Sequence, residues 1–337
     1  MGRVTTVGRV TREHWPGRSW EVASDPRLDP VLERLPALPT TSLLVVSGGR
    51  VVGQYGQPDE IGYLASARKS VLSVLFGRPV ADGTIKLGQT LAELGIDDVG
   101  GLLPSERAAT VRDLLTARSG VFHTAATLSG YEVGLPARGS EPPGSTFRYN
   151  NWDFNALGTV FEQCTGRAVF DAVAEDLAGP LEFEDFDPGR QRVLGRPERS
   201  RHLAHHLFLS GRDLARVGLL AVRHGRWNGR PVVPRQWLAE STSVQVDRRA
   251  QGPLDYGYLW WLPRPLGPGA FLAAGNFGQY LLGVPALDLV LVHRWTVPDE
   301  IVIEQNQGAA EPAGPSADGV SVRQFLQVAR AVIRALE

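Results

Sequence analysis

Residues 66–69 read Ser-Ala-Arg-Lys, and this short stretch carries most of the information about the fold. The apolar residues that follow it predict a helix over residues 66–78. Positions three apart lie on one face of a helix, so the Ser66 hydroxyl and the Lys69 amine would be neighbours. A serine becomes a strong nucleophile when a base removes its proton, and a neutral lysine amine can be that base. The motif alone is weak, because a helix-capping serine and a lysine in solvent give the same pattern.

The use of lysine in this chain gives weak support to the functional interpretation. Among 35 basic residues, only Lys69 and Lys86 are lysines. Arginine stays protonated in proteins and cannot serve as a base. A chain that uses arginine almost everywhere would keep lysine where a removable proton is needed, but coding bias explains the same pattern.

A second candidate group, Tyr149-Asn150-Asn151, follows a loop rich in Gly, Pro and Ser. The Tyr149 phenol can relay a proton between a nucleophile and a leaving group. The Asn151 amide can hold both Lys69 and a substrate carbonyl. The alternative is a loop aromatic beside an asparagine that caps the helix predicted over residues 151–165.

A third group, Gly275-Asn276-Phe277-Gly278-Gln279, lies between two predicted apolar strands. Glycine permits a ligand to approach the backbone closely. A backbone N–H next to Gly278 could stabilise a negatively charged oxygen. A β-bulge or a turn is the alternative.

The composition is that of an ordinary globular protein. The 337 residues are 43% hydrophobic and 21% charged, with a net charge of −1, which gives no electrostatic reason to expect nucleic acid or an anionic membrane as partner. No apolar run reaches the roughly 18 residues of a membrane span, and residues 1–20 show no secretory signal. The single cysteine, Cys164, excludes an intrachain disulfide. These features predict a cytoplasmic protein.

No metal site is expected. The spacing of His202, His205 and His206 suits metal binding, but no acidic or cysteine partner stands nearby in the sequence. A helix face or a loop explains these histidines better.

The order of the predicted elements is strands, a long helical middle, then strands and a closing helix. A strand–turn–strand unit is predicted over residues 42–53, with Gly48-Gly49 as its turn. We expect one sheet domain from residues 1–70 and 245–337, a mainly helical domain from 71–244, and the active site between them. Other expected elements are a helix at 213–224, strands at 256–262, 271–274, 279–284 and 287–295, a loop at 304–319 and a helix at 320–336.

The three motifs, in this order, resemble those of the serine β-lactamase and penicillin-binding protein family, in particular its class C-like branch. Within that branch the chain is most similar to nylon-oligomer (6-aminohexanoate-dimer) hydrolases and family VIII esterases. The likeness covers about residues 40–300. Further segments that resemble this branch are 111–116 with 119–121, 147–158, 213–218, 229–237, 257–261 and 275–288.

The resemblance implies an α+β fold of the β-lactamase/transpeptidase type: an antiparallel sheet flanked by helices, with an inserted helical domain. It implies Ser66 as the acylated nucleophile, Lys69 as the base, Tyr149 as the proton relay, and Asn151 as the group that positions Lys69 and substrate. The oxyanion hole would consist of the backbone N–H groups of Ser66 and Gln279. No cofactor is implied.

The sequence departs from the family at the third motif. Family members carry Lys-Thr-Gly or a His variant there, whereas this chain has no cation at the corresponding Asn276-Phe277-Gly278. Because that cation binds the carboxylate of penicillins and cell-wall peptides, β-lactamase activity is not expected. Arg148 and Arg294 are candidates for a remaining positive charge. The expected substrate pocket is neutral and aromatic, formed by Trp152, Asn276, Phe277, Gly278, Tyr280 and Trp260.

These observations predict a serine hydrolase that acts on a small-molecule ester or amide. An acyltransferase that moves the acyl group to an alcohol or amine uses the same residues and is the first alternative. A non-catalytic binding module on the same fold is the second, and a binder has no need of all four of Ser66, Lys69, Tyr149 and Asn151. The sequence carries no signal of an oligomeric state.

Overall fold

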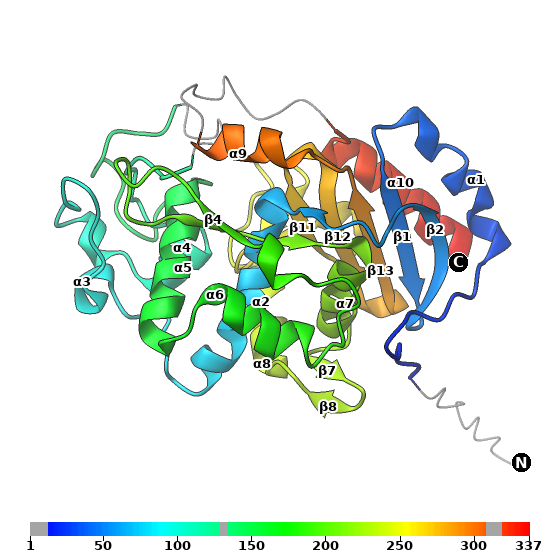
Figure 1. Ribbon diagram of the computed structural model, residues 1–337. Helices are drawn as coiled ribbons and strands as arrows, with labels where there is room; N and C mark the ends of the chain where they lie inside the picture. The colour runs from blue at the N-terminus through cyan, green and yellow to red at the C-terminus, as the bar shows by residue number, and fades with distance from the viewer. Residues whose placement is uncertain (1–12, 128–133, 308–318) are drawn as a thin grey trace, which may run out of the picture.

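A seven-stranded antiparallel sheet forms the centre of the computed structural model, which describes residues 13–127, 134–307 and 319–337 (Figure 1). The strand order is β2-β1-β13-β12-β11-β10-β9, so strands from the two ends of the chain meet where β1 pairs with β13. The strands are β1 (Ser42–Ser47), β2 (Arg50–Gly56), β9 (Leu254–Tyr256), β10 (Trp261–Pro263), β11 (Phe271–Gly275), β12 (Gln279–Val284) and β13 (Leu289–Arg294).

The N-terminal hairpin has the turn that its glycine pair predicts. Ser47 pairs with Arg50 across a two-residue loop. Gly48 and Gly49 both have positive φ, at 58° and 78°. A two-residue hairpin loop of this kind requires positive φ at both positions, a conformation that glycine adopts without steric cost.

Helices cover both faces of the sheet. Alternate side chains of β1 belong to different buried clusters: Leu43 and Val45 lie in one, Leu44 and Val46 in the other, as the two-residue period of a strand requires. Helix α10 packs on the first face and α7 on the second. The helices are α1 (Asp29–Leu32), α2 (Arg68–Ala81), α3 (Leu91–Leu94), α4 (Val111–Leu115), α5 (Asn151–Thr165), α6 (Val169–Ala172), α7 (Gly211–Val222), α8 (Arg235–Ser241), α9 (Asp299–Gln307) and α10 (Val322–Leu336).

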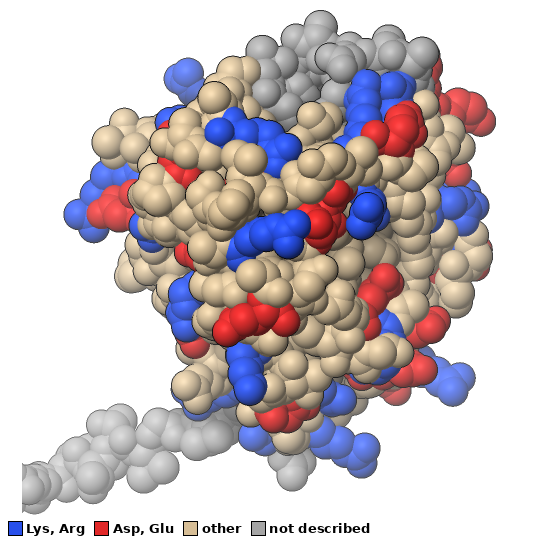
Figure 2. Space-filling view, turned by 90° about the vertical axis from the view of Figure 1, so that its left-hand side faces the viewer, with Lys and Arg blue, Asp and Glu red and all other residues tan. Residues whose placement is uncertain are grey.

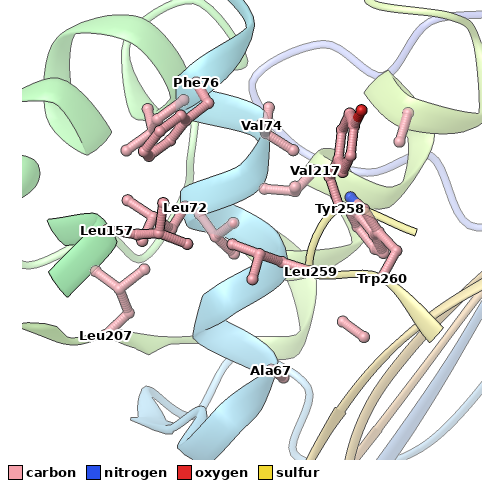
Figure 3. Close-up of a cluster of buried hydrophobic side chains, with 14 of the residues drawn as sticks. Ala67, Leu72, Val74, Phe76, Leu157, Leu207, Val217, Tyr258, Leu259 and Trp260 are labelled. Atoms are coloured by element: carbon pink, nitrogen blue, oxygen red, sulfur yellow. The ribbon is translucent and has the colours of Figure 1, made fainter. Parts of the chain in front are cut away.

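Helix α2 is buried on nearly all sides and joins the sheet to the remaining helices. Figure 3 shows Leu72 and Phe76 directed toward Leu157, while Val74 lies near Val217 and Tyr258. A helix surrounded by apolar partners is fixed in position and orientation. Its first turn therefore holds the residues of the first motif in a fixed place.

Helix α8 also packs against α2, and the indole Nε1 of Trp237 donates a hydrogen bond to the carbonyl of Ser73 at 2.7 Å.

Short strand pairs complete the fold around this framework. The strand pairs are β3 (Gly62–Tyr63) with β6 (Phe208–Leu209), β4 (Arg192–Leu194) with β5 (Ala204–His206), and β7 (Arg226–Trp227) with β8 (Arg230–Pro231).

The single strand predicted over residues 256–262 is wrong. The structure has β9 and β10 there, separated by residues 257–260, with Leu259 at φ 63°. The backbone N–H of Tyr258 donates to the carbonyl of Ser241, and that of Leu259 to Leu115. This segment is therefore held against the ends of α4 and α8, and its alternating aromatic residues do not belong to one continuous strand.

The prediction of a loop over residues 304–319 is also wrong for its first residues. Helix α9 continues to Gln307, and Val302 packs in a buried cluster with Tyr63 and Phe277. The remainder of the predicted loop, residues 308–318, lies outside the described residues.

The division into a sheet domain and a helical domain stays a prediction. Helix α7, from the range predicted to be the helical domain, packs against β12, β13 and β1. Within the described ranges, no helix combines the length and the apolar character needed to cross a membrane. On the face in Figure 2, basic and acidic side chains are intermixed, which agrees with the near-neutral net charge.

Arg216 of α7 is fully buried and joins three parts of the chain. Its guanidinium donates to Glu184 and to the carbonyls of Leu181 and Gly17, each at 2.9 Å. Arg216→Ala is expected to lower the free energy of unfolding by about 3–5 kcal/mol, because a buried carboxylate and the carbonyls of Leu181, Gly17 and Arg18 each lose a donor. Urea denaturation followed by circular dichroism measures the change.

The matched control is Arg230→Ala, which removes an exposed arginine and should change stability by less than about 0.5 kcal/mol. Equal stability of the two variants would mean that the buried network contributes nothing to the fold.

Candidate active site

Ser66 lies in a 3₁₀ turn, Ala65–Ala67, that leads into helix α2. Ala65 has a positive φ of 47°, a strained conformation for a residue with a Cβ. The turn is held by hydrogen bonds from the N–H of Ala67 to the carbonyl of Leu64, and from the N–H of Leu64 to Leu207. As a result Ser66 remains half-exposed while Lys69, three residues later, is buried.

The amine of Lys69 brings the first two motifs together. Its Nζ lies 3.0 Å from Ser66 Oγ, 2.8 Å from the Tyr149 hydroxyl and 2.8 Å from Asn151 Oδ1. The aromatic rings of Tyr149 and Phe154 lie over it, with centroids at 4.4 and 4.3 Å. The four residues predicted to be catalytic therefore form one contiguous group around a single nitrogen.

A second buried cation lies next to this group. Arg68 is 4% exposed and donates to Asn155 Oδ1 at 3.1 Å, and burial lowers the pKa of its guanidinium. Burial, followed by the charges of Arg68 and Lys69, holds the pKa of His206 well below its ordinary value. Burial and neighbouring positive charge both favour the neutral form of an amine.

Helix α5 fixes Tyr149 and Asn151, and its first turn is locked by buried polar contacts. Asn150 caps the helix by accepting a hydrogen bond from the N–H of Asp153 at 2.9 Å. The Ser119 hydroxyl donates to Asp153 at 2.5 Å, and burial raises the pKa of this carboxyl well above its ordinary value. Asn151 Nδ2 donates to the carbonyl of Thr127 at 3.1 Å, which directs its oxygen toward Lys69. These supporting contacts were not predicted.

A cavity of about 410 Å³ opens at Ser66 and Tyr149. The indole of Trp261 stacks on the Tyr149 ring with centroids 5.5 Å apart and an interplanar angle of 27°. The other lining residues are Arg248, Gln251, Gly252, Pro253, Leu254, Ala274, Gly275, Asn276, Phe277, Gly278, Tyr280, Gly319, Val320, Ser321 and Val322.

The end of strand β11 passes directly over the nucleophile turn. A Cβ built on Gly275 would lie 3.0 Å from the backbone nitrogens of Ser66 and Ala67 and 2.5 Å from the carbonyl oxygen of Leu64. Only glycine permits so close an approach of two backbones. The third motif therefore reaches the site through Gly275, at the point where the strand ends.

The backbone N–H of Gln279 stays a prediction as an oxyanion donor. Gln279 is fully buried at the start of β12 and does not belong to the residues that line the cavity. Its side chain accepts from Arg294 at 2.5 Å and donates to the carbonyl of Trp295 at 2.5 Å. The segment that lies beside the Ser66 backbone nitrogen is Gly275, four residues earlier.

Four of the predicted pocket residues, Asn276, Phe277, Gly278 and Tyr280, line the cavity. Trp152 does not: it is fully buried, and its indole donates to Asp98 at 2.6 Å.

Trp260 does not line the cavity either. It is fully buried and packs against Phe271 with ring centroids 5.0 Å apart. The adjacent Trp261 provides the wall instead.

The positive charge in the cavity comes from a residue that was not predicted. Arg148 is half-exposed and pairs with Glu141, and Arg294 is buried against Gln279. Neither lines the cavity, whereas Arg248 does. No sequence signal separates Arg248 from the adjacent Arg249.

Two of the three histidines considered for metal binding have other polar partners, and the third, His206, packs against the ring of Tyr63. His202 lies 2.9 Å from the Thr159 hydroxyl, and His205 lies 3.1 Å from Glu162. Among the residues that the structure describes, no group of three or more His, Cys, Asp or Glu side chains is placed to hold a metal ion.

Comparison with known structures places this geometry in a recognised fold. A Bacillus anthracis protein described as a 6-aminohexanoate-dimer hydrolase matches with a TM-score of 0.68 at 20% identity, over 94% of this chain and 86% of its own. A family VIII carboxylesterase matches with a TM-score of 0.62 at 14% identity, over 94% and 99%. EstCE1, described as a hydrolase with promiscuous acyltransferase activity, matches with a TM-score of 0.61 at 16% identity, over 91% and 97%.

The predicted α+β, β-lactamase/transpeptidase-like fold is therefore confirmed. No curated protein matches the chain. The Beta-lactamase family model matches residues 28–304, which is most of the chain. The chain belongs to the beta-lactamase family.

Proposed function

We propose that this protein is a serine hydrolase that cleaves a small ester or amide through an acyl-enzyme on Ser66. The observation that supports the proposal is the position of Lys69 Nζ, which lies within 3.0 Å of Ser66 Oγ, the Tyr149 hydroxyl and Asn151 Oδ1. Ser66 and Tyr149 also line an open cavity. A nucleophile in hydrogen-bond contact with an oriented base is the arrangement that covalent catalysis requires.

In the acylation step, Lys69 takes the Ser66 proton as Oγ attacks the carbonyl carbon and forms the new C–O bond. The bond between that carbon and the leaving oxygen or nitrogen then breaks, and Tyr149 gives the leaving group a proton. Tyr149 recovers its proton from Lys69, with which it is in contact. In deacylation, water loses a proton to the same pair as it attacks the ester carbonyl; the bond between the acyl carbon and Ser66 Oγ then breaks, and the pair returns the proton to Oγ, which releases the acid and free Ser66.

The oxyanion that forms in each step would be stabilised by two backbone N–H groups. One belongs to Ser66, at the first turn before α2, where backbone N–H groups lack helical acceptors. The second belongs to the segment 275–277, because Gly275 lies beside the Ser66 nitrogen and the next two residues line the cavity.

Acyl transfer to an acceptor other than water uses the same acyl-enzyme. EstCE1, one of the structural neighbours, is described as a hydrolase with promiscuous acyltransferase activity. Product analysis with a candidate alcohol or amine present separates the two activities, because a transferase forms new ester or amide faster than free acid.

Ser66→Ala should abolish both covalent labelling and turnover. Intact-protein mass spectrometry after exposure to a fluorophosphonate should show one adduct on the native protein and none on the variant. Turnover of an ester should fall by several orders of magnitude, about 10⁶-fold where another serine hydrolase loses its nucleophile. Ser145→Ala, which removes an exposed hydroxyl near the site, should label and turn over normally. Undiminished turnover in Ser66→Ala would refute the assignment.

Lys69→Arg should be about as inactive as Lys69→Met. Arginine keeps the positive charge but cannot accept a proton at working pH, so both variants lose general-base catalysis, worth about 10²–10⁴-fold. The measurement is kcat/KM for an ester across the pH range. Lys86→Arg is the matched control, because it replaces the other lysine of the chain, which is exposed. A Lys69→Arg protein with near-native activity would exclude Lys69 as the base.

Gly275→Ala should impair catalysis through the backbone. The added Cβ would contact the nitrogens of Ser66 and Ala67 and push β11 away from the nucleophile turn. Loss of one oxyanion donor costs about 10²–10³-fold in kcat, and the rate of fluorophosphonate labelling should fall with it. Gly88→Ala adds a Cβ with nothing within 4 Å and should leave both rates unchanged. Normal labelling of a folded Gly275→Ala protein would place the oxyanion site elsewhere.

A further inference from the structure

Arg68 is a buried arginine whose charge has no carboxylate partner among the described residues. It is one of four buried arginines in that part of the chain, and it donates a hydrogen bond to Asn155 Oδ1 at 3.1 Å. The other three are better compensated: Arg216 and Arg223 each pair with a carboxylate, and Arg294 donates to three oxygen atoms. A buried charge with so few partners is costly to the fold, so stability does not explain why it is there.

The position of Arg68 directs its charge at the catalytic group. It is the residue before Lys69 in the first turn of α2, and both side chains are buried. Burial lowers the pKa of the Arg68 guanidinium, and electrostatic interactions with Tyr63 and then Tyr149 partly offset that effect. Arg68 does not line the catalytic cavity. Its charge therefore reaches the catalytic residues, although its side chain lies where a substrate in the cavity would not touch it.

The titratable groups around Lys69 do not cancel this charge. Burial, followed by the charges of Arg68 and Lys69, holds the pKa of His206 on β5 well below its ordinary value, which favours the neutral imidazole. Burial raises the pKa of Asp153 in the first turn of α5 well above its ordinary value, which favours the neutral carboxyl. Arg248, which lines the cavity together with Tyr149, adds a second positive charge. The electrostatic potential at Lys69 is therefore positive.

We propose that Arg68 is a positioning residue for proton transfer, whose unpaired charge keeps Lys69 in the neutral form that can take the Ser66 proton. Two positive charges at neighbouring buried positions repel each other, so the form of Lys69 without its extra proton is favoured. The same charge favours a phenolate at Tyr149, and the two groups that exchange the proton are biased together. The inference rests on the proposed function for the role of Lys69 as the base.

Arg68→Gln tests the effect on catalysis, because it removes the charge and keeps an N–H donor for Asn155. At an effective dielectric constant of about 20, a unit charge about 10 Å away shifts a protonation equilibrium by about one pH unit. The acid limb of kcat/KM for 4-nitrophenyl butanoate should therefore move to higher pH by about one unit. On that limb kcat/KM should be about tenfold lower than in the native enzyme, and the plateau at higher pH should be recovered.

Two further variants are controls for the loss of charge. Arg68→Lys keeps a positive charge at the same position and should keep the acid limb of the native enzyme. Arg78→Gln removes an exposed arginine of the same helix and should also leave the limb in place.

Stability separates this role from a structural one. Loss of an unpaired buried charge should not weaken the fold, so the urea midpoints of Arg68→Gln and of a second neutral variant, Arg68→Met, should equal or exceed that of the native protein. A lower midpoint together with an unmoved acid limb would make Arg68 a structural residue and overturn the proposal.

The charge of Lys69 can be followed without turnover, because Lys69 and Lys86 are the only lysines of the chain. Protein labelled with ¹³C,¹⁵N-lysine gives two side-chain signals in NMR spectra, and Lys86→Arg assigns them. In Arg68→Gln the titration of Lys69 should move to higher pH by about one unit, while that of the exposed Lys86 should not move.

An unmoved titration of Lys69 in Arg68→Gln would overturn the proposal. The expected shift, in a protein whose native form neither reacts with a fluorophosphonate nor hydrolyses the ester, would refute the hydrolase and leave the effect of Arg68 on Lys69 standing.

Discussion

The buried amine of Lys69 is the constraint on which the rest of the site depends. An amine placed among the rings of Tyr149 and Phe154 is unfavourable unless polar partners surround it, and here they come from the turn before α2 and the start of α5. The two segments are 80 residues apart in sequence, so the tertiary fold must hold them. The locked first turn of α5 and the tightly packed helix α2 meet that requirement.

The sheet contributes to the same site by close approach of its backbone. Strand β11 ends against the nucleophile turn at Gly275, and the residues that follow it form one wall of the cavity. Tyr149 and Trp261, stacked on each other, form another part of the lining. The cavity is therefore bounded by a rigid strand end and a pair of packed aromatic rings, an arrangement that keeps reacting groups in place.

The sequence allowed prediction of the elements with a strong local signal and of the residues with a distinctive chemistry. The hairpin predicted over residues 42–53 follows from its glycine turn, helix α5 from its helical period, and the group around Lys69 from the motifs. Trp152 and Trp260 were misplaced because an aromatic residue near a motif can equally well be buried behind it. Arg248 could not be singled out as a lining residue of the cavity, because nothing in the sequence separates it from the adjacent Arg249.

The position of the N-terminal hairpin in the sheet affects how the protein is made. Strand β1 pairs with β13, and the hydroxyl of Thr41 bonds to the carbonyl of Arg294, 253 residues later. During synthesis the hairpin leaves the ribosome long before its partner strand exists, with an apolar edge unpaired. The central sheet can close only after β13 has been synthesised, and a pairing between segments so distant in sequence is of the kind that slows folding and leaves a strand edge open to aggregation until then.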